Sequence, residues 1–155
     1  MITIERTHDM SLVNRIVKHP KIWNSLTDDA QDKYWYPLDD ANIHWLLVLI
    51  ECIPAGVFMV HRHNQICWEI HTAILPEYWG ERAREAAKAV LKYLFTNTDC
   101  EKLITNVPET NKAALRYAKA SGMKLFGTNT KSFKKNGVLM DQYMLGIEKG
   151  EWLCL

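Results

Sequence analysis

The strongest pattern in the sequence is a long helical stripe that follows several short apolar runs. Between Gly80 and Thr96, small or apolar residues recur at the i, i+3, i+4, i+7 spacing of one helix face, while charged residues occupy the opposite face. Such a helix must bury its apolar face against another layer. The preceding sequence supplies that layer, because it contains three runs typical of strands. The chain is therefore predicted to pack a long helix on a sheet.

The three runs predict an antiparallel meander. Trp45–Ile50 is a continuous apolar run, typical of a strand buried on both faces. Pro54-Ala55-Gly56 is predicted to turn the chain into a strand at Val57–His61. A polar turn at residues 62–64 then leads into a third strand at Ile66–Leu75. Consecutive strands joined by short turns pair antiparallel, so these runs form the centre of the predicted sheet.

The rest of the chain alternates between shorter helices and strands, with a Lys-rich loop before the last strand. The further elements that we predict are a strand at Ile2–Glu5, helices at Ser11–Lys18 and Lys21–Leu26, a strand at Leu103–Val107, a helix from Asn111 to Ser121, and strands at Met123–Gly127 and Val138–Ile147. Because Leu103–Val107 follows a crossover helix, it is expected to lie parallel to the strand before it. We predict one α/β domain over residues 1–155, with a mixed, mostly antiparallel sheet of about seven strands and about four flanking helices. This sheet should splay into a V after its fourth strand.

Composition excludes several classes of protein. With 48% hydrophobic and 24% charged residues, the chain is not intrinsically disordered. A net charge of +1 argues against nucleic acid or an anionic membrane as the main partner. The longest apolar stretch, Trp45–Val60, is too short to span a membrane and is interrupted by Glu51 and Pro54. The N-terminus lacks the features of a signal peptide, and the four cysteines form no CxxC pair. A cytoplasmic protein with reduced thiols is expected.

Three stretches of the sequence together resemble the GCN5-related N-acetyltransferase (GNAT) superfamily. The first is the apolar strand at residues 46–50 followed by Pro54-Ala55-Gly56-Val57. The second, Ile74–Ala83, is similar to the acetyl-CoA loop of the ribosomal-protein acetyltransferase branch. The third runs from Asn111-Lys112-Ala113-Ala114 to Ser121-Gly122-Met123 and is similar to the Asn-x-x-Ala/Ser…Gly-Phe signature of the last helix of the family. The likeness covers Ile43–Ile147, with the first forty residues similar in topology.

The resemblance implies acetyl-CoA as cosubstrate, bound where the third meander strand meets the long helix. A tight turn into a helix presents free backbone N–H groups and the positive end of the helix dipole to a pyrophosphate. The cosubstrate-binding residues implied are Ile74, Leu75, Trp79, Gly80, Glu81, Arg82, Ala83, Arg84, Asn111 and Tyr117. The loop departs from the family pattern Gln/Arg-x-x-Gly-x-Gly/Ala, because it reads Glu77-x-x-Gly80-x-Arg82. Arg82 either obstructs the phosphate position or pairs with the phosphates.

The candidate catalytic residues are Glu69, His71 and Tyr117. Glu69 and His71 lie at i and i+2 on a predicted strand and so share a face. In the family, a carboxylate at the position of Glu69 is often the general base, and His71 is a second candidate because histidine is a common general base. The family's proton-donating tyrosine corresponds to Ala118 here. Tyr117 lies about 100° round the helix from that position, which favours packing or contact with the cosubstrate over acid catalysis.

Two further clusters leave alternatives open. His61-x-His63 is half of a zinc site, but no carboxylate or cysteine pair completes it nearby in the sequence, so no metal site is predicted. An aromatic group in the segment that shapes the acceptor pocket in the family either lines a substrate cleft or fills the core. This group consists of Trp23, Tyr34, Trp35 and Tyr36.

The function predicted from the resemblance is transfer of an acetyl group from acetyl-CoA to a primary amine, on a small molecule or a protein, by direct attack in a ternary complex. The alternative is a catalytically silent protein with the same fold and a structural role, similar to small GNAT-like head-assembly proteins of tailed bacteriophages. Arg82 and Ala118 favour that alternative. The apolar tail at residues 151–155 is expected to dock on its own domain, on a second copy of the chain or on another protein.

Overall fold

The computed structural model describes all 155 residues and contains seven strands, five α-helices and one short 3-10 helix. In chain order these are β1 (Ile2–Arg6), α1 (Met10–Val17), α2 (Pro20–Leu26), β2 (Ile43–Ile50), β3 (Ile53–Arg62), β4 (Cys67–Ile74), η1 (Pro76–Tyr78), α3 (Glu81–Asn97), β5 (Lys102–Pro108), α4 (Lys112–Ala120), β6 (Lys124–Lys135), β7 (Val138–Glu148) and α5 (Lys149–Trp152). The strands form one sheet in the order β1-β2-β3-β4-β5-β7-β6. Only β4 and β5 pair parallel, because α3 crosses over between them. The predicted fold class is confirmed.

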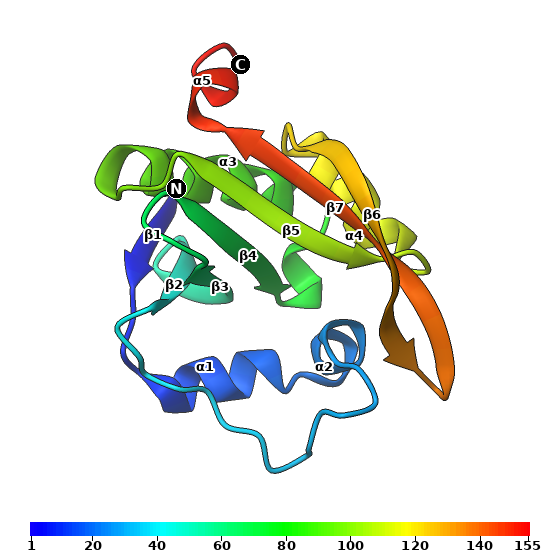
Figure 1. Ribbon diagram of the computed structural model, residues 1–155. Helices are drawn as coiled ribbons and strands as arrows, with labels where there is room; N and C mark the ends of the chain where they lie inside the picture. The colour runs from blue at the N-terminus through cyan, green and yellow to red at the C-terminus, as the bar shows by residue number, and fades with distance from the viewer.

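Helices cover both faces of the sheet (Figure 1). The larger core lies between α3 and one face, where Leu94 and Phe95 pack against strand residues such as Phe58. The smaller core lies under α1 and α2 on the other face, around Val13 and Ile16. The alternation of side chains along β4 therefore assigns its residues to two different environments.

The sheet opens between β4 and β5. Their parallel pairing covers only Cys67–Glu69 of β4 and Lys102–Ile104 of β5. One further contact follows, in which the Thr105 hydroxyl donates a hydrogen bond to the carbonyl oxygen of Ile70 at 3.0 Å. Beyond it the strands diverge towards α2 and α4, as Figure 1 shows. The predicted V-shaped splay is confirmed, and it leaves one edge of β4 without a strand partner.

The first turn of the meander lies earlier than predicted. β2 ends at Ile50, and the two residues Glu51 and Cys52 form the turn with φ values of 49° and 65°. Two positive φ values match the twist of a two-residue hairpin, and here that geometry overrides the absence of glycine. Pro54 and Gly56, predicted to form the turn, lie inside β3. A Cβ on Gly56 would lie 2.6 Å from the carbonyl oxygen of Ala73, so this glycine permits close approach of β4.

The predicted Lys-rich loop is also wrong, because β6 continues through it to Lys135. Asn136 and Gly137 form the turn into β7, as predicted, with φ values of 52° and 76°. The tip of this hairpin reaches the end of α2. Lys135 Nζ donates to the carbonyl oxygens of Asn24 and Thr27, at 2.6 and 2.5 Å. The backbone N–H groups of the turn each donate to the Asp29 carboxylate at 2.8 Å.

The C-terminal tail docks partly on its own domain. Residues 149–152 form α5, and the Trp152 ring lies 5.4 Å from that of Phe95. Leu153 and Leu155 remain 70% and 82% exposed, so docking on a partner stays a prediction for these two side chains.

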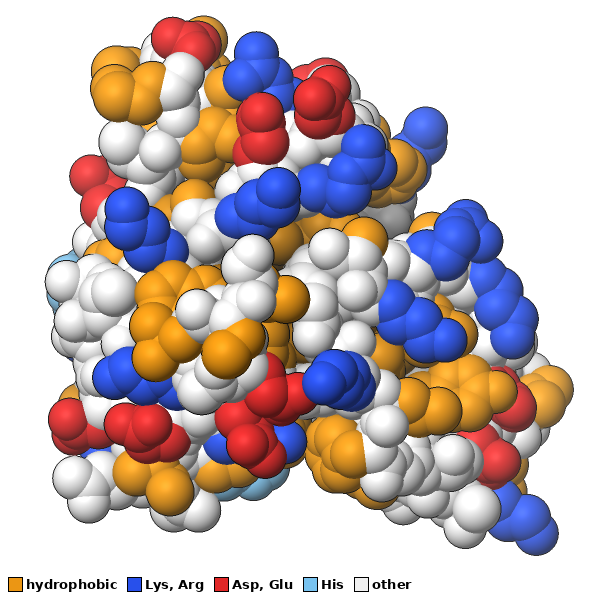
Figure 2. Space-filling model, turned by 90° about the horizontal axis from the view of Figure 1, so that it is seen from above, with side chains coloured by type: hydrophobic (Ala, Val, Ile, Leu, Met, Phe, Trp, Pro, Cys, Tyr) orange, Lys and Arg blue, Asp and Glu red, His pale blue; other side chains and the backbone are white.

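On the face seen in Figure 2, several Lys and Arg side chains lie next to one another in the upper and right-hand parts, and Asp and Glu side chains gather at the lower left. Over the whole chain the charges nearly balance, with 19 Lys and Arg against 18 Asp and Glu residues. None of the helices combines the length and the apolar character that crossing a membrane requires.

Candidate active site

Two adjoining cavities occupy the opening between β4 and β5. The first, of about 220 Å³, lies between the diverging strands and is lined by Thr72 of β4 and Thr105 of β5. The second, of about 300 Å³, continues to Gly80 at the start of α3. The two form one groove, since they share five lining residues: Ser25, Thr72, Asn111, Ala114 and Tyr117.

The N-terminus of α3 is open towards this groove. Gly80 takes φ 87° and ψ −124°, and no side chain caps the helix. By contrast, α1, α2 and α4 are capped by Asp9, His19 and Asn111. The first turn of α3 thus retains free backbone N–H groups, which favour an anion. The indole of Trp79 holds the preceding loop in place, because its Nε1 donates to the Ile74 carbonyl oxygen at 2.8 Å.

The predicted cosubstrate-binding residues divide into two sets. Those that line the groove are Ile74, Trp79, Gly80, Ala83, Asn111 and Tyr117. Those that do not are Leu75, which packs against the smaller core, and the exposed Glu81, Arg82 and Arg84. The Arg82 guanidinium contacts the Glu85 carboxylate at 3.4 Å, and the side chain is 51% exposed. Arg82 therefore leaves the groove open.

Tyr117 lies at the boundary of the two cavities. Its hydroxyl donates to the Ala83 carbonyl oxygen at 3.0 Å, which ties α4 to the first turn of α3. Burial raises the pKa of this hydroxyl, so it stays protonated at neutral pH. Ala118, the position of the tyrosine in the family, lines the first cavity as well.

Sequence reasoning missed several lining residues. Thr72 follows His71 on β4, but its side chain lies on the α3 side of the sheet, in both cavities. Lys21 and Ser25 are four residues apart on α2 and line the second cavity together. Their i, i+4 spacing places them on one face of a helix, and it is the one sequence signal that could have predicted that they line the same cavity.

On the opposite face of β4, three imidazoles surround one carboxylate. Glu69 is buried, and its oxygens lie 2.8 Å from His71 Nε2, 3.3 Å from His61 Nε2 and 3.1 Å from His63 Nε2. The Asn106 amide also donates to Glu69 Oε1 at 3.0 Å. We name the four residues His61, His63, Glu69 and His71 the His–Glu cluster. No carboxylate near His61-x-His63 in the sequence completed a metal site, but the fold brings the Glu69 carboxylate to these two histidines.

The cluster determines the ionisation of Glu69. Burial of this carboxyl raises its pKa, but the hydrogen bond and charge of His71, with smaller contributions from His63 and His61, outweigh burial and lower the pKa to about 2. Burial also lowers the pKa of His61, against the opposing effect of Glu69. An acid with a pKa of about 2 is a weak base at neutral pH, so Glu69 is better suited to orient His71 than to accept a proton.

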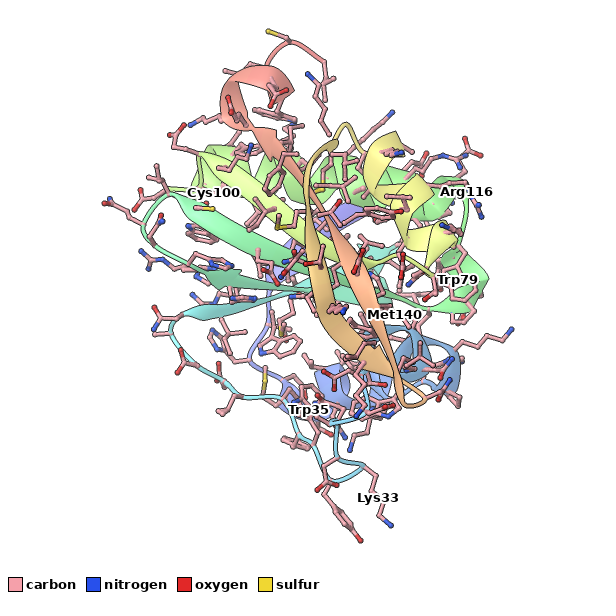
Figure 3. All side chains as sticks on the ribbon, turned by 45° about the vertical axis from the view of Figure 1, so that its right-hand side comes forward. Lys33, Trp35, Trp79, Cys100, Arg116 and Met140 are labelled. Carbon is pink, nitrogen blue, oxygen red and sulfur yellow. The ribbon has the colours of Figure 1, made fainter.

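A third cavity, of about 280 Å³, lies on the face of the sheet covered by α1 and α2. It meets the first cavity at His71 and Leu26, which line both. Three tryptophan rings from separate segments form much of its wall: Trp23 and Trp35 lie 5.7 Å apart, and Trp35 and Trp45 lie 6.4 Å apart. No Asp or Glu lines it. Figure 3 shows Trp35 near α1 and α2, well away from Trp79.

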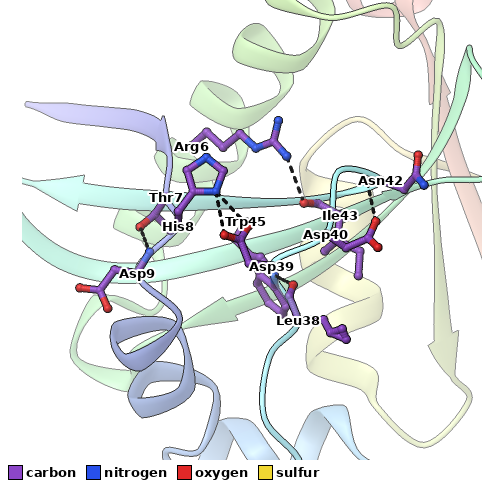
Figure 4. Close-up of polar contacts among 10 residues, drawn as sticks. All are labelled: Arg6, Thr7, His8, Asp9, Leu38, Asp39, Asp40, Asn42, Ile43 and Trp45. Carbon is purple, nitrogen blue, oxygen red and sulfur yellow. Dashed lines mark hydrogen bonds and ion pairs between the residues drawn. The ribbon is translucent and has the colours of Figure 1, made fainter.

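Polar contacts hold the segment that carries Trp35 (Figure 4). This segment, residues 27–42, contains turns but no helix or strand. His8 Nδ1 lies 2.9 Å from Asp39 Oδ1, and the Trp45 indole donates to the Leu38 carbonyl oxygen at 2.8 Å. The aromatic wall is therefore fixed at one end to β2 and to the start of α1.

Comparison with known proteins identifies the family. The family model described as an acetyltransferase (GNAT) domain matches residues 3–124, which is most of the chain. The chain belongs to the GNAT acetyltransferase family. The GNAT fold extends over the whole chain: a spermidine N-acetyltransferase from Vibrio cholerae, solved with CoA and spermine, is similar with a TM-score of 0.82 over 98% of both chains at 18% identity. A GNAT-family acetyltransferase from Bacillus anthracis has a TM-score of 0.61 and 25% identity over 71% of this chain and 68% of its own. No curated protein sequence matches the chain.

Membership of the GNAT family makes this chain an acetyltransferase with acetyl-CoA as cosubstrate. The open groove fits such a ligand. It runs along the unpaired edge of β4 and ends at an uncapped helix N-terminus, the element that binds phosphate groups. Small side chains, such as Ala83 and Ala114, leave space beside it.

Proposed function

We propose that this GNAT enzyme acetylates the primary amine of an apolar, single-amine acceptor held in the tryptophan-lined cavity, by direct attack in a ternary complex. The observation that carries the proposal is the position of His71. This side chain lines both the groove and the tryptophan-lined cavity, so it lies where an amine and a thioester would meet. The cavities approach β4 from opposite faces and connect at this residue.

Residues that line the groove would bind acetyl-CoA. Acetyl-CoA, when bound, supplies the acetyl group as an activated thioester. Thr72, Ala83 and Tyr117 would contact it along the groove, and the N-terminus of α3 would bind its phosphates. The unpaired edge of β4 beyond Glu69 offers backbone N–H groups that would polarise the thioester oxygen.

His71 would accept the proton that the attacking amine loses. Its Nε2 lies 2.8 Å from the Glu69 carboxylate, so the neutral ring would carry its own proton there and accept the proton of the amine at Nδ1. The ionised Glu69 would then stabilise the imidazolium and hold the ring orientation, as a carboxylate beside a catalytic histidine does. We therefore assign proton transfer to His71 and a positioning role to Glu69, in reverse of the order expected from the family.

The lining of the tryptophan-lined cavity supports the acceptor class. A polyamine carries several positive charges and needs carboxylates to balance them when it leaves water. This cavity offers three indoles and no acidic side chain. Aromatic faces bind the apolar part of an amine and tolerate one cationic group. An arylalkyl amine fits this lining better than spermidine.

Two measurements test the proposal. Calorimetric titration with acetyl-CoA should give a Kd in the micromolar range, roughly −8 kcal/mol. Release of CoA should then be faster with phenethylamine or tryptamine than with spermidine, by about tenfold or more in kcat/KM. Absence of acetyl-CoA binding would contradict the transferase assignment, and a preference for spermidine would contradict the acceptor class.

The alternative, a catalytically silent assembly protein, is less consistent with this geometry. If the protein were catalytically silent, the side chain of Arg82 would be expected to fill the phosphate position. Arg82 instead points to Glu85 on the exposed face of α3.

A further inference from the structure

The His–Glu cluster contains more nitrogen donors than the proposed chemistry uses. One imidazole beside one carboxylate is sufficient for proton transfer, but three Nε2 atoms lie within 3.3 Å of the Glu69 oxygens. His61 and His63 have no part in the proposed function. They come to Glu69 because β3 and β4 pair in a register that sets His61 opposite Glu69.

The donor atoms have the spacing of a metal site. One ligand atom each from His61, Glu69 and His71 can be chosen so that all lie within 4.8 Å of one another. Two ligands of a tetrahedral ion with bonds of about 2.0–2.1 Å are roughly 3.3 Å apart. The contact from Glu69 Oε2 to His61 Nε2, at 3.3 Å, already has this value, and His71 Nε2 at 2.8 Å would move slightly outward. Rotation of the imidazoles about χ2, a soft torsion, aligns their lone pairs.

The surroundings of the cluster also suit an ion. The Glu69 side chain is 12% exposed and the three histidines are 31–44% exposed, so an ion can reach a site that is partly shielded from water. Asn106 holds Glu69 through Oε1, which leaves Oε2 facing His61 and His71. Carboxylates that bind metals are commonly held by such an outer hydrogen bond.

We propose that the His–Glu cluster binds one divalent ion of the Zn²⁺ class, through Nε2 of His61, Nε2 of His71 and Oε2 of Glu69, with a water molecule as the fourth ligand. Imidazole and carboxylate are ligands that Zn²⁺ accepts in this number and mixture.

The consequence for activity rests on the proposed function. A neutral imidazole has one N–H and one lone pair. When the ion takes the lone pair of His71 Nε2, the proton resides on Nδ1, and the ring has no site left to accept a proton from the amine. Bound Zn²⁺ thus inhibits acetyl transfer, and a chelator restores it.

The test compares three chains treated with EDTA and then dialysed: the parent, His61→Gln and the control His8→Gln. His8 is exposed and pairs with Asp39, outside the cluster. Titration calorimetry with ZnCl₂ is expected to show one tight site in the parent and in His8→Gln. In His61→Gln the affinity for Zn²⁺ should be at least about tenfold weaker. Loss of even a hydrogen-bond partner of a metal ligand produces an effect of this size. Circular dichroism checks that each variant is folded.

A second readout separates this site from the exposed thiols of Cys52 and Cys154, because thiolates are also ligands for Zn²⁺. Co²⁺ in the cluster should give the visible absorption of a tetrahedral ion with nitrogen and oxygen ligands, without a thiolate charge-transfer band, and His61→Gln should lose it. Equal Zn²⁺ affinity in His61→Gln and His8→Gln, or no one-to-one site in the parent, would overturn the proposal.

The activity assay distinguishes the two proposals. In EDTA, His61→Gln should acetylate amines as the parent does but resist inhibition by Zn²⁺. If the parent binds Zn²⁺ in the cluster but transfers no acetyl group in EDTA, the metal site stands and the proposed function fails. Activation of the parent by Zn²⁺ would overturn the inhibitory role.

Discussion

The two faces of β4 present surfaces of different kinds. On the α3 and α4 face, the groove is built from a helix N-terminus, a glycine with positive φ and small side chains such as Ala83 and Ala114. On the α1 and α2 face, the tryptophan-lined cavity and the His–Glu cluster are built from large side chains. Backbone recognition depends on the fold alone, whereas side-chain recognition depends on which residues each member of a family carries. The first face therefore suits a common cosubstrate and the second suits a particular acceptor.

The largest expected effect tests which residue on the second face accepts the proton. His71→Gln should lower kcat by about 10²–10⁴, the range for removal of a positioned base, and should leave the Kd of acetyl-CoA unchanged. Glu69→Gln should lower kcat less, and Glu69→Asp should recover part of the loss because it restores a carboxylate. A greater loss in Glu69→Gln than in His71→Gln would return the role of base to Glu69. Steady-state kinetics in EDTA and calorimetry measure both quantities.

The next effect separates the two faces directly. Trp35→Ala removes one wall of the tryptophan-lined cavity, so the KM for an arylalkyl amine should rise about tenfold, equivalent to roughly 1.4 kcal/mol. The KM for acetyl-CoA should stay the same. Tyr34→Ala is the matched control, because Tyr34 is the adjacent aromatic residue, is 79% exposed and lines no part of the cavity. An equal rise in both variants would show that the tryptophans fill the core without binding the acceptor.

A smaller effect is expected at Tyr117, on the groove side. Tyr117→Phe removes the hydrogen bond to the Ala83 carbonyl, which should lower the free energy of unfolding by about 1 kcal/mol. Chemical denaturation measures this loss, and turnover at saturating acetyl-CoA should change less than about threefold. If turnover instead falls by about two orders of magnitude or more, the scale of general acid catalysis, Tyr117 is the acid that protonates the thiolate.

The smallest effect is expected at Arg82. Its pair with Glu85 is exposed, and such pairs contribute little to stability. Because the Arg82 side chain points to Glu85 and does not line the groove, Arg82→Ala should change the Kd of acetyl-CoA by less than about threefold in calorimetry. Tighter binding by Arg82→Gly than by the parent would show that the arginine obstructs the phosphate position in solution.

The sequence predicted the groove side better than the acceptor side, for a physical reason. The helix expected at Gly80–Thr96 is observed at Glu81–Asn97, because its periodicity and the glycine before it are local signals. The cap at Asn111 and the stop at Gly122 are local as well. The positions of Gly80, Ala83 and Asn111 at the ends of these helices can therefore be predicted without information on tertiary contacts.

The His–Glu cluster, by contrast, depends on strand register. The sequence predicted a turn at residues 62–64, between a strand ending at His61 and one starting at Ile66, and it fixed no register between them. In the structure β3 continues to Arg62, which pairs with Trp68, and His61 lies opposite Glu69. Turn length determines register, and a shift changes which side chains meet. The tryptophan wall depends in the same way on three segments that only the tertiary fold brings together.

The contact between the β6–β7 hairpin and the end of α2 has a consequence for the order of folding. Lys135 and Asn24 are 111 residues apart, so their hydrogen bond forms only after both ends of the chain have reached the sheet. Contacts of this kind carry a high loop-closure cost and open more readily than the core. The amide hydrogens of Asn136 and Gly137, which are bonded to Asp29, should therefore exchange with solvent through local opening. Amide hydrogens in β3 should exchange only through global unfolding. Hydrogen exchange at this turn would report how often the hairpin separates from α2 in the native state.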